Sequence, residues 1–212
     1  MKFFTFAAIP ILPRASAIFR ALGFSKEKTL IKKVQEKDLN IFIEEARRYI
    51  TVKAHAARMS ITNLTDTTVS LENDIRLESQ DLAAFLRGSQ EVLLMGSTAG
   101  QPIMELIEKV SAQGDLTRAV VYNAVASELA DEALSWLMVY FRHQLRRENL
   151  GLDYRRFSAG YGDLSIEYQK TFWEALKLEQ IGIRITEEFF LLPEKSVTAL
   201  SGIRTIGYER KD

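Results

Sequence analysis

The chain has 212 residues, 47% of them hydrophobic, which is enough to bury a substantial core. Lysine plus arginine and aspartate plus glutamate each total 28, so the charge balance gives no electrostatic basis for binding nucleic acid. Cysteine is absent, which excludes disulfides and thiolate chemistry. The only histidines are His55 and His143, far apart in the sequence, so we do not expect a zinc-type metal site.

The N-terminal stretch MKFFTFAAIPILPRASA has a lysine, a short apolar run and an Ala-x-Ala ending, and so imitates a secretory signal. Pro10, Pro13 and Arg14 interrupt the apolar run, however. We therefore expect a strand that leads into a helix ending at Gly23. No stretch reaches the roughly 20 apolar residues of a membrane-spanning helix, and we expect a cytoplasmic protein that does not contact a membrane.

The next part of the chain alternates between helical and strand patterns. Residues 25–49 have apolar side chains near the 3.6-residue period, which predicts one amphipathic helix or two in succession. Residues 50–77 are rich in threonine, valine and isoleucine and predict two or three short antiparallel strands. Ser79 is expected to begin a short helix that Gly88 ends, and residues 91–95 to form a buried strand.

The segment MGSTAGQP, residues 95–102, is predicted to be a loop that leads into a helix over residues 103–112. Such a loop could place backbone N–H groups against an anion. It lacks the lysine of a phosphate-binding P-loop and the three-glycine spacing of a dinucleotide fingerprint. An ordinary strand-to-helix turn is the favoured interpretation.

Residues 115–149 are predicted to form the longest helix, which is apolar almost all the way round between residues 119 and 141. A narrow polar stripe interrupts it: Asn123, Ser127, Glu128, Asp131, Glu132 and Ser135. The stripe either faces water or lines a polar site, in which a carboxylate meets a cation or sugar hydroxyls.

The C-terminal third is expected to contain a turn around Gly160, a helix over residues 165–178 that closes near Gly182, and two final strands, IRITEEFFLLP and VTALSGIRTIGY. Helices and strands are interleaved without a regular strand–helix repeat. The pattern predicts an α+β fold, a mainly antiparallel sheet with packed helices, in one domain over residues 1–212.

The stretch RFSAGYGD, residues 156–163, has two interpretations. In one it is a glycine-permitted turn with a surface arginine and a core tyrosine. In the other, Gly160 and Gly162 let the backbone approach a ligand, while Arg156 offers a planar fork to a carboxylate. The second interpretation suits a zwitterionic ligand that carries hydroxyl groups.

The segment from Arg155 to Ile203 resembles the activation domain of cobalamin-dependent methionine synthase, with its signature R-P-A-P-G-Y-P, then L-T-E-S, then P-x-x-S-V-S-G. The matching residues are Arg156, Gly160, Tyr161, Gly182, Thr186, Glu187, Pro193, Ser196 and Val197, with Thr198 and Ala199 in place of serine and glycine. The helix ASELADEALSWL is similar to the family's A-x-x-L-A-E-A-x-A-E-x-L and aligns Asp131 with its ligand-contacting glutamate.

The resemblance implies an S-adenosylmethionine-binding protein that reactivates an oxidised cobalamin carried by a partner, in methionine biosynthesis. The implied partners are a cobalamin-dependent methionine synthase or another corrinoid protein, and a flavodoxin or ferredoxin-type reductant. The chain would be a component of a methyltransferase, serving as a separate subunit, and the chemistry would belong largely to the cofactor.

The resemblance also implies roles for individual residues. Backbone groups of Ser158, Ala159, Gly160 and Tyr161 would contact S-adenosylmethionine, Arg156 would pair with its carboxylate, and Asp131 would hold its amine or a ribose hydroxyl. Tyr161 would be the catalytic residue, placed where the corrin arrives. The chain departs from the family at Glu167, which stands in place of a cobalamin-facing histidine, and in having no counterpart of an N-terminal ligand-binding aspartate.

Two other functions remain open from the sequence. The chain could be an interaction module that docks on a corrinoid protein without binding S-adenosylmethionine. It could also be an independent S-adenosylmethionine-dependent methyltransferase with a small acceptor, which would turn over without cobalamin.

Overall fold

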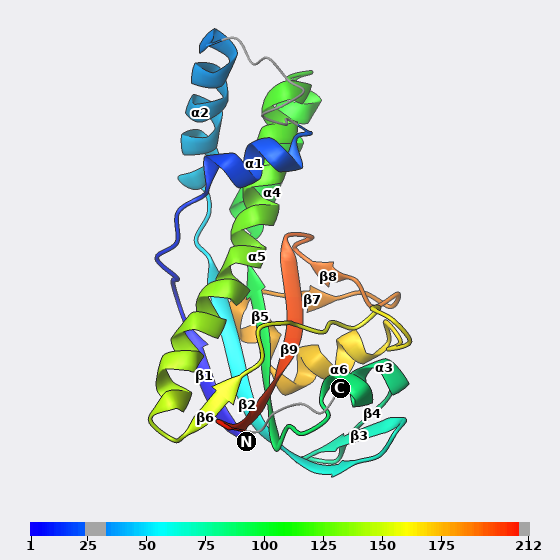
Figure 1. Cartoon of the computed structure of the whole chain (residues 1–212). Helices are drawn as coiled ribbons and strands as arrows, with labels where there is room; N and C mark the ends of the chain where they lie inside the picture. Colours follow the sequence, from blue (N-terminus) through cyan, green and yellow to red (C-terminus); the bar gives the residue numbers. More distant parts are fainter. Residues whose placement is uncertain (24–32, 208–212) are drawn as a thin grey trace.

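The computed structural model describes residues 1–23 and 33–207, and its centre is a seven-stranded sheet in which every pairing is antiparallel (Figure 1). The order is β4-β3-β2-β5-β9-β6, and β1 pairs with β2. The strands are β1 (Lys2–Phe6), β2 (Lys53–Leu64), β3 (Thr68–Leu71), β4 (Ile75–Glu78), β5 (Glu91–Thr98), β6 (Leu150–Leu152) and β9 (Ser196–Thr205).

Two further strands, β7 (Arg184–Ile185) and β8 (Leu191–Leu192), form a separate small hairpin beside β9 (Figure 1). The helices are α1 (Ala15–Ala21), α2 (Lys33–Arg47), α3 (Gln80–Phe85), α4 (Gln101–Ala112), α5 (Leu116–Arg146), α6 (Tyr168–Ala175) and the 3-10 helix η1 (Leu178–Ile181). None of the helices in the described ranges is long and apolar enough to cross a membrane.

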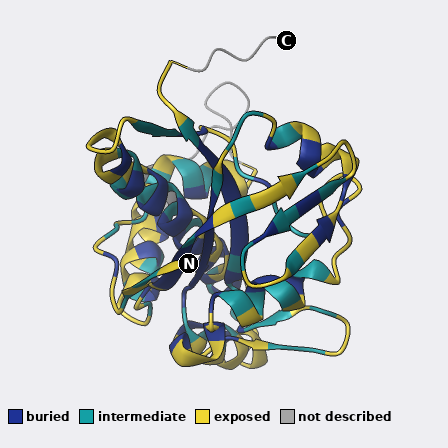
Figure 2. Ribbon diagram, turned by 90° about the horizontal axis from the view of Figure 1, so that it is seen from below, coloured by how far each residue is buried: buried dark blue, intermediate teal, exposed yellow. Residues whose placement is uncertain are grey.

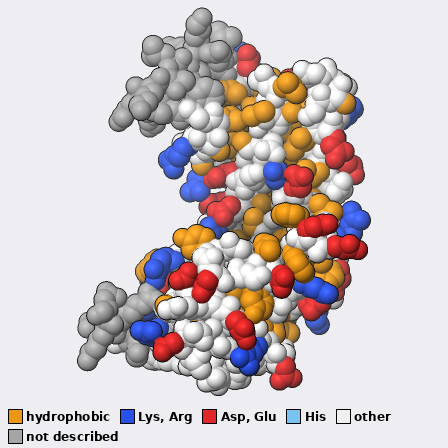
Figure 3. Space-filling view, turned by 90° about the vertical axis from the view of Figure 1, so that its right-hand side faces the viewer, with side chains coloured by type: hydrophobic (Ala, Val, Ile, Leu, Met, Phe, Trp, Pro, Cys, Tyr) orange, Lys and Arg blue, Asp and Glu red, His pale blue; other side chains and the backbone are white. Residues whose placement is uncertain are grey.

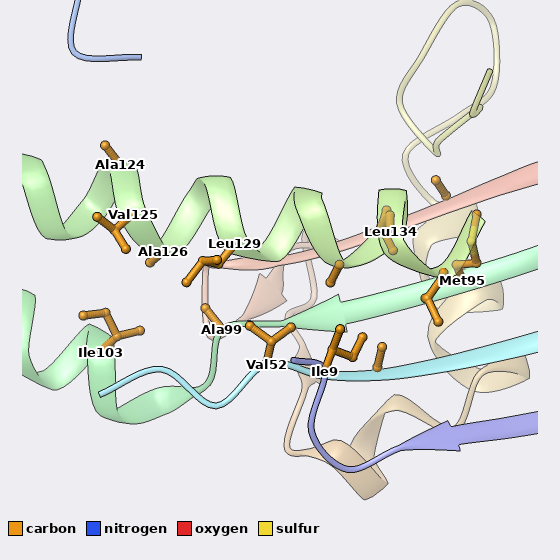
Figure 4. Packing of buried hydrophobic residues seen from close by; sticks show 14 of the residues in the cluster. Ile9, Val52, Met95, Ala99, Ile103, Ala124, Val125, Ala126, Leu129 and Leu134 are labelled. Carbon is orange, nitrogen blue, oxygen red and sulfur yellow. The ribbon is translucent and has the colours of Figure 1, made fainter. Parts of the chain in front are cut away.

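Helix α5 covers one face of the sheet, and its apolar residues form the larger core with α1, α2 and α4 (Figure 4). Leu129 and Leu134 of α5 lie over Val52 and Met95, next to β2 and on β5 (Figure 4). Asp115 caps the start of the helix, because its carboxylate accepts a hydrogen bond from the Arg118 N–H at 3.0 Å. The 31-residue helix packs on the sheet and also on α2 and α4.

The opposite face of the sheet carries a second core, formed with α3, α6 and η1. Along β5, Leu93 and Met95 belong to the first core and Val92 and Leu94 to the second. Figure 2 shows buried residues concentrated in the central strands and on the inner faces of the helices, and exposed residues mainly on loops, outer helix faces and strand ends. The sheet is therefore sandwiched between two layers of helices, which explains why β5 is apolar on both faces.

The α+β class, the mainly antiparallel sheet and the long helix are confirmed. Residues 50–77 form three antiparallel strands as expected, but only β3 and β4 are short, since β2 has 12 residues. Helix α1 and the turn at Gly23 are also as expected. Of the amphipathic segment over residues 25–49, the structure describes α2, and residues 24–32 lie outside the described part of the chain.

Several elements differ from the expectation. Strand β5 continues through Gly96, Ser97 and Thr98, which were expected in a loop, because they pair with Thr198, Val197 and Ser196 of β9. The single strand expected over residues 183–193 is the β7–β8 hairpin, since Phe189 has a positive φ of 67°. Helix α6 begins at Tyr168 rather than near residue 165, and the short edge strand β6 was not expected.

Candidate functional site

A cavity of about 890 Å³ lies where α5, the RFSAGYGD segment, the start of α6, β9 and the β7–β8 hairpin meet. Charged groups along its wall are the carboxylates of Asp131, Glu188 and Glu194 and the guanidinium of Arg156. A ligand that carries positive charge therefore meets a net excess of carboxylates. Elsewhere on this side of the molecule, acidic and basic side chains lie next to one another with apolar side chains between them (Figure 3).

Arg156 and Asp131 bind each other at this cavity. Nη2 of Arg156 lies 3.0 Å from both carboxylate oxygens of Asp131, and Nη1 donates to the Asp131 carbonyl at 3.2 Å. The side chains are 25% and 57% exposed, respectively. An ion pair with one partner this exposed contributes little to stability, on the order of 0–1 kcal/mol. Both groups can therefore change partner at low cost.

The position of Asp131 is set by the packing of α5 on β5. The buried hydroxyl of Ser97 donates to the carbonyl of Ala130 at 2.7 Å. Ala130 directly precedes Asp131. This hydrogen bond therefore fixes the position of α5 on β5 next to Asp131. Ser97 was expected in an anion-binding or simple turn, and the structure instead gives it this positioning contact.

Two other carboxylates of the polar stripe on α5, those of Glu128 and Glu132, bind a different partner. Arg14, at the start of α1, donates to Glu128 at 3.1 Å and to Glu132 at 2.6 Å. The hydrogen bond to Glu128, followed by the negative charges of Glu132 and Glu128, raises the pKa of the Arg14 guanidinium above its ordinary value. The stripe is thus divided: Glu128 and Glu132 tie the N-terminal segment to α5, while Asp131 faces the cavity.

The two glycines of RFSAGYGD have local reasons to be glycine. Gly160 has φ +81° and Gly162 has φ +55°, both in the left-handed region. A Cβ at Gly160 would lie 3.1 Å from Ile166, and one at Gly162 would lie 2.4 Å from a carboxylate oxygen of Asp81. The turn is therefore packed closely against its neighbours, on the side of α3 and of the segment that precedes α6.

Asp163 ties this turn to the N-terminus of α3. Its carboxylate accepts a hydrogen bond from the Ser79 hydroxyl, and also from the backbone N–H groups of Gln80 at 2.7 Å and Asp81 at 3.2 Å. These bonds, the one from Ser79 foremost, hold the pKa of Asp163 below its ordinary value of 3.8. A carboxylate at a helix N-terminus also complements the helix dipole.

Tyr161 points away from the first cavity. It lines a neighbouring cavity of about 830 Å³ together with Phe85, Tyr154 and Arg155, and Arg156 lines both cavities. Its ring packs edge-on against Phe157, with centroids 5.4 Å apart, and the residue is 68% exposed. Its phenol is consequently accessible to a second molecule that approaches beside the first cavity.

The structure brings four of the predicted site residues to the wall of the first cavity: Asp131, Arg156, Ser158 and Ala159. Gly160 and Tyr161 follow in the same turn but do not line it. Sequence reasoning missed Gln169, which lines the cavity and is 7% exposed. The sequence does contain a signal for Gln169. It is a polar residue on the same helical face as the apolar residues Phe172 and Leu176, which follow it by three and seven positions.

The structure is an α+β fold built on an antiparallel sheet, with a cavity of about 890 Å³ between α5, β9 and the β7–β8 hairpin. No family model matches the sequence, and no curated protein matches it either. Among solved structures, the chain is similar to the MetH reactivation domain bound to AdoHcy, with a TM-score of 0.69 and 15% sequence identity. The similarity covers 98% of this chain and 79% of that one. At this identity the likeness establishes the fold.

Proposed function

We propose that the protein binds S-adenosylmethionine in the cavity at Arg156 and Asp131 and serves as a subunit that reactivates a corrinoid methyltransferase. The observation that carries the proposal is the Arg156–Asp131 pair, a cation and an anion in contact at the wall of a cavity of about 890 Å³. The fold neighbour that binds AdoHcy, the demethylated form of the same molecule, supports the same ligand.

The methionyl end of S-adenosylmethionine carries one carboxylate and one ammonium group, which match the two members of the pair. The carboxylate would bind the guanidinium of Arg156 and the ammonium would bind Asp131, so that the ligand inserts between two groups that now hold each other. Each new charge-assisted hydrogen bond contributes about 1.5–3 kcal/mol. The exposed ion pair that it replaces is worth less.

The size and charge of the cavity fit the rest of the S-adenosylmethionine molecule. Ligand-sized cavities span roughly 300–1,000 Å³, and this one falls in that range. Glu188 and Glu194 add two carboxylates from the β7–β8 hairpin and from the residue after Pro193, facing the same space. They favour a ligand with a positively charged sulfonium, although water and salt screen exposed carboxylates.

The neighbouring cavity, which Tyr161 lines, supports a docking surface for the partner beside the first cavity. A corrinoid held by the partner and reduced by one electron from the reductant would accept the methyl group of S-adenosylmethionine, and S-adenosylhomocysteine would remain in the first cavity. This chain's own residues hold and orient the methyl donor, and Tyr161 offers a phenol at the surface where the partner would dock. The partner would be a cobalamin-dependent methionine synthase or a related corrinoid protein, with a flavodoxin or ferredoxin-type reductant.

Two measurements test the proposal. Isothermal titration calorimetry should detect S-adenosylmethionine binding with 1:1 stoichiometry, and methyl transfer to the corrinoid should require the partner protein, a reductant and this chain together. Docking on the corrinoid protein without heat from S-adenosylmethionine would favour an interaction module instead. Turnover of S-adenosylmethionine with a small acceptor and no corrinoid would favour an independent methyltransferase.

A further inference from the structure

Phe190 is an aromatic residue whose side chain is open to water at the wall of the first cavity. It directly precedes β8, lines the cavity and is 64% exposed. Ile166, in the segment before α6, lines the same cavity and is 42% exposed. The other large apolar residues of this wall are buried or half-buried. Two apolar surfaces in the cavity are therefore uncovered, and a ligand that covers them gains the free energy of apolar burial.

The backbone around Phe190 is fixed by the turn between β7 and β8. The Thr186 N–H donates to the Phe190 carbonyl at 2.9 Å, and the Phe190 N–H donates to the Thr186 hydroxyl at 3.2 Å. Phe189, directly before Phe190, has a positive φ of 67°, in the left-handed region that bulky residues rarely adopt. Backbone strain of this kind clusters at ligand-binding sites, where the surrounding structure maintains it. The turn thus holds the Phe190 ring at the cavity at a conformational cost.

Ile166 brings the second apolar surface from the RFSAGYGD turn. Its Cδ1 lies 3.1 Å from where a Cβ of Gly160 would be, so its side chain packs on the segment that carries Arg156. Phe190 comes from the hairpin instead. A flat group that contacts both side chains therefore lies in the cavity between the hairpin and the turn, and the Arg156–Asp131 pair lines the same cavity.

The chemistry of S-adenosylmethionine indicates which of its parts meets these apolar surfaces. Its carboxylate and ammonium groups match the Arg156–Asp131 pair, and its adenine is the one planar aromatic part of the molecule. A purine ring stacks on an aromatic side chain through its π-face, and this contact needs no particular pattern of hydrogen-bonding groups on the base. Adenine is therefore the part of the ligand that suits Phe190.

We propose that Phe190 positions the ligand by stacking on its adenine ring, with Ile166 adding a second apolar contact to the same ring. This inference rests on the proposed binding of S-adenosylmethionine, because the adenine enters the cavity as part of that ligand. With the methionyl end at Arg156 and Asp131 and the base at Phe190, the ligand is held at both ends. Phe190 takes no part in bond making or breaking.

Calorimetry with S-adenosylhomocysteine tests the contact. Phe190→Ala should weaken binding about fivefold or more, which is the lower end of the effect of losing a base–aromatic stack. Tyr49→Ala is the matched control and should retain the parent affinity, because Tyr49 is an aromatic residue that is 49% exposed and does not line the cavity. The melting temperature of free Phe190→Ala should stay close to that of the parent, since substitutions of exposed side chains cost little stability.

Proton NMR supplies a second readout, which a purely structural role of Phe190 would not change. When the adenine lies over the Phe190 ring, the ring current should shift the adenine proton signals of bound S-adenosylhomocysteine upfield from their positions in the free ligand. Phe190→Leu keeps an apolar side chain without an aromatic ring. At saturating ligand this variant should lose most of the upfield shift.

The outcomes separate the two proposals. Unchanged affinity in Phe190→Ala, or an upfield shift that persists in Phe190→Leu, overturns the stacking contact while leaving S-adenosylmethionine binding intact. Slower methyl transfer to the partner's corrinoid in Phe190→Ala at unchanged ligand affinity also overturns it, and assigns the ring to docking of the partner. Absence of binding of S-adenosylmethionine and S-adenosylhomocysteine to the unaltered protein overturns the proposed function and the inference with it.

Discussion

Arg156 and Asp131, 25 positions apart in the sequence, form an ion pair in which one guanidinium nitrogen lies 3.0 Å from both carboxylate oxygens. The two residues were each expected to bind a charged group of a ligand, and in the free protein they satisfy each other. Each member of the pair therefore has a counter-charge until a zwitterion replaces both contacts. Each member can be tested by removing its charge.

Arg156→Ala should weaken S-adenosylmethionine binding at least tenfold, because about 1.5–3 kcal/mol is lost for each charge-assisted bond to the ligand carboxylate. The melting temperature of the free protein should change little, since the partner Asp131 is 57% exposed and stays solvated. Calorimetry and thermal denaturation measure the two effects. Arg155→Ala is the matched control, because Arg155 does not line the first cavity. Equal binding by the Arg156 variant and the parent would remove this residue from the site.

Asp131→Asn keeps the shape of the side chain and removes its charge. Binding of S-adenosylmethionine should fall roughly tenfold, because the ligand ammonium loses its counter-charge. Glu132→Gln provides the comparison one residue later, since Glu132 pairs with Arg14 and does not line the cavity. A large loss of stability in Asp131→Asn with binding unchanged would assign this carboxylate to the fold instead.

Tyr161→Phe should leave S-adenosylmethionine binding nearly unchanged, because the ring lines the neighbouring cavity. Methyl transfer to the partner's corrinoid should slow substantially if the phenol contacts the corrinoid only in the assembled complex. An interaction made on the way to the transition state affects rate without affecting ground-state affinity. The change in the absorbance of the corrinoid measures the rate of methyl transfer. Identical rates for Tyr161→Phe and the parent protein would exclude a role for the hydroxyl.

Gly162→Ala should destabilise the protein, because a Cβ there would lie 2.4 Å from Asp81 and the backbone has a positive φ. Gly114→Ala isolates the backbone cost, since Gly114 also has a positive φ but has nothing within 4 Å of the added carbon. We expect about 1 kcal/mol for Gly114→Ala and at least about 1 kcal/mol more for Gly162→Ala. Chemical denaturation measures both, and equal losses would show that Asp81 moves aside freely.

The lowered pKa of Asp163 predicts that the stability of the protein depends on pH. Its pKa in the folded protein is below the ordinary value of 3.8, so its stabilising contribution is full above that value and is lost as the pH falls through the lowered pKa. Asp163→Asn should therefore melt at a lower temperature than the parent near neutral pH, with the difference shrinking below about pH 4. Asp66→Asn, at a side chain that is 95% exposed, should show no such convergence. A gap that is constant with pH would contradict the assignment.

Much of the fold could be predicted because its signals are local. The long apolar helix α5, the Ser79 cap of α3 and the glycine turns are each specified by neighbouring residues. The β7–β8 hairpin could not be predicted in this way. Its sequence is apolar enough for one strand, and the chain reverses only because Thr186 and Phe190 bond across the turn, with Phe189 at a positive φ. Likewise, Ser97 and Thr98 belong to β5 because β9 is there to pair with them.

The same limit applies to the site. Asp131 and Arg156 were each predicted from their own segments, but their ion pair depends on how α5 packs on the sheet. Gln169 gave a weaker signal, since a lone polar residue on a helix face has many explanations. Its place in the cavity follows from its contact with Thr198, which lies 29 positions later and on another element.

A crystal structure of the protein with S-adenosylhomocysteine would show where the ligand binds. We expect ligand density in the cavity between α5 and the β7–β8 hairpin, with the ligand carboxylate at Arg156, its ammonium group at Asp131, and the direct contact between these two side chains opened. Density for the ligand at another surface, or an intact Arg156–Asp131 pair beside an empty cavity at saturating ligand, would contradict this expectation.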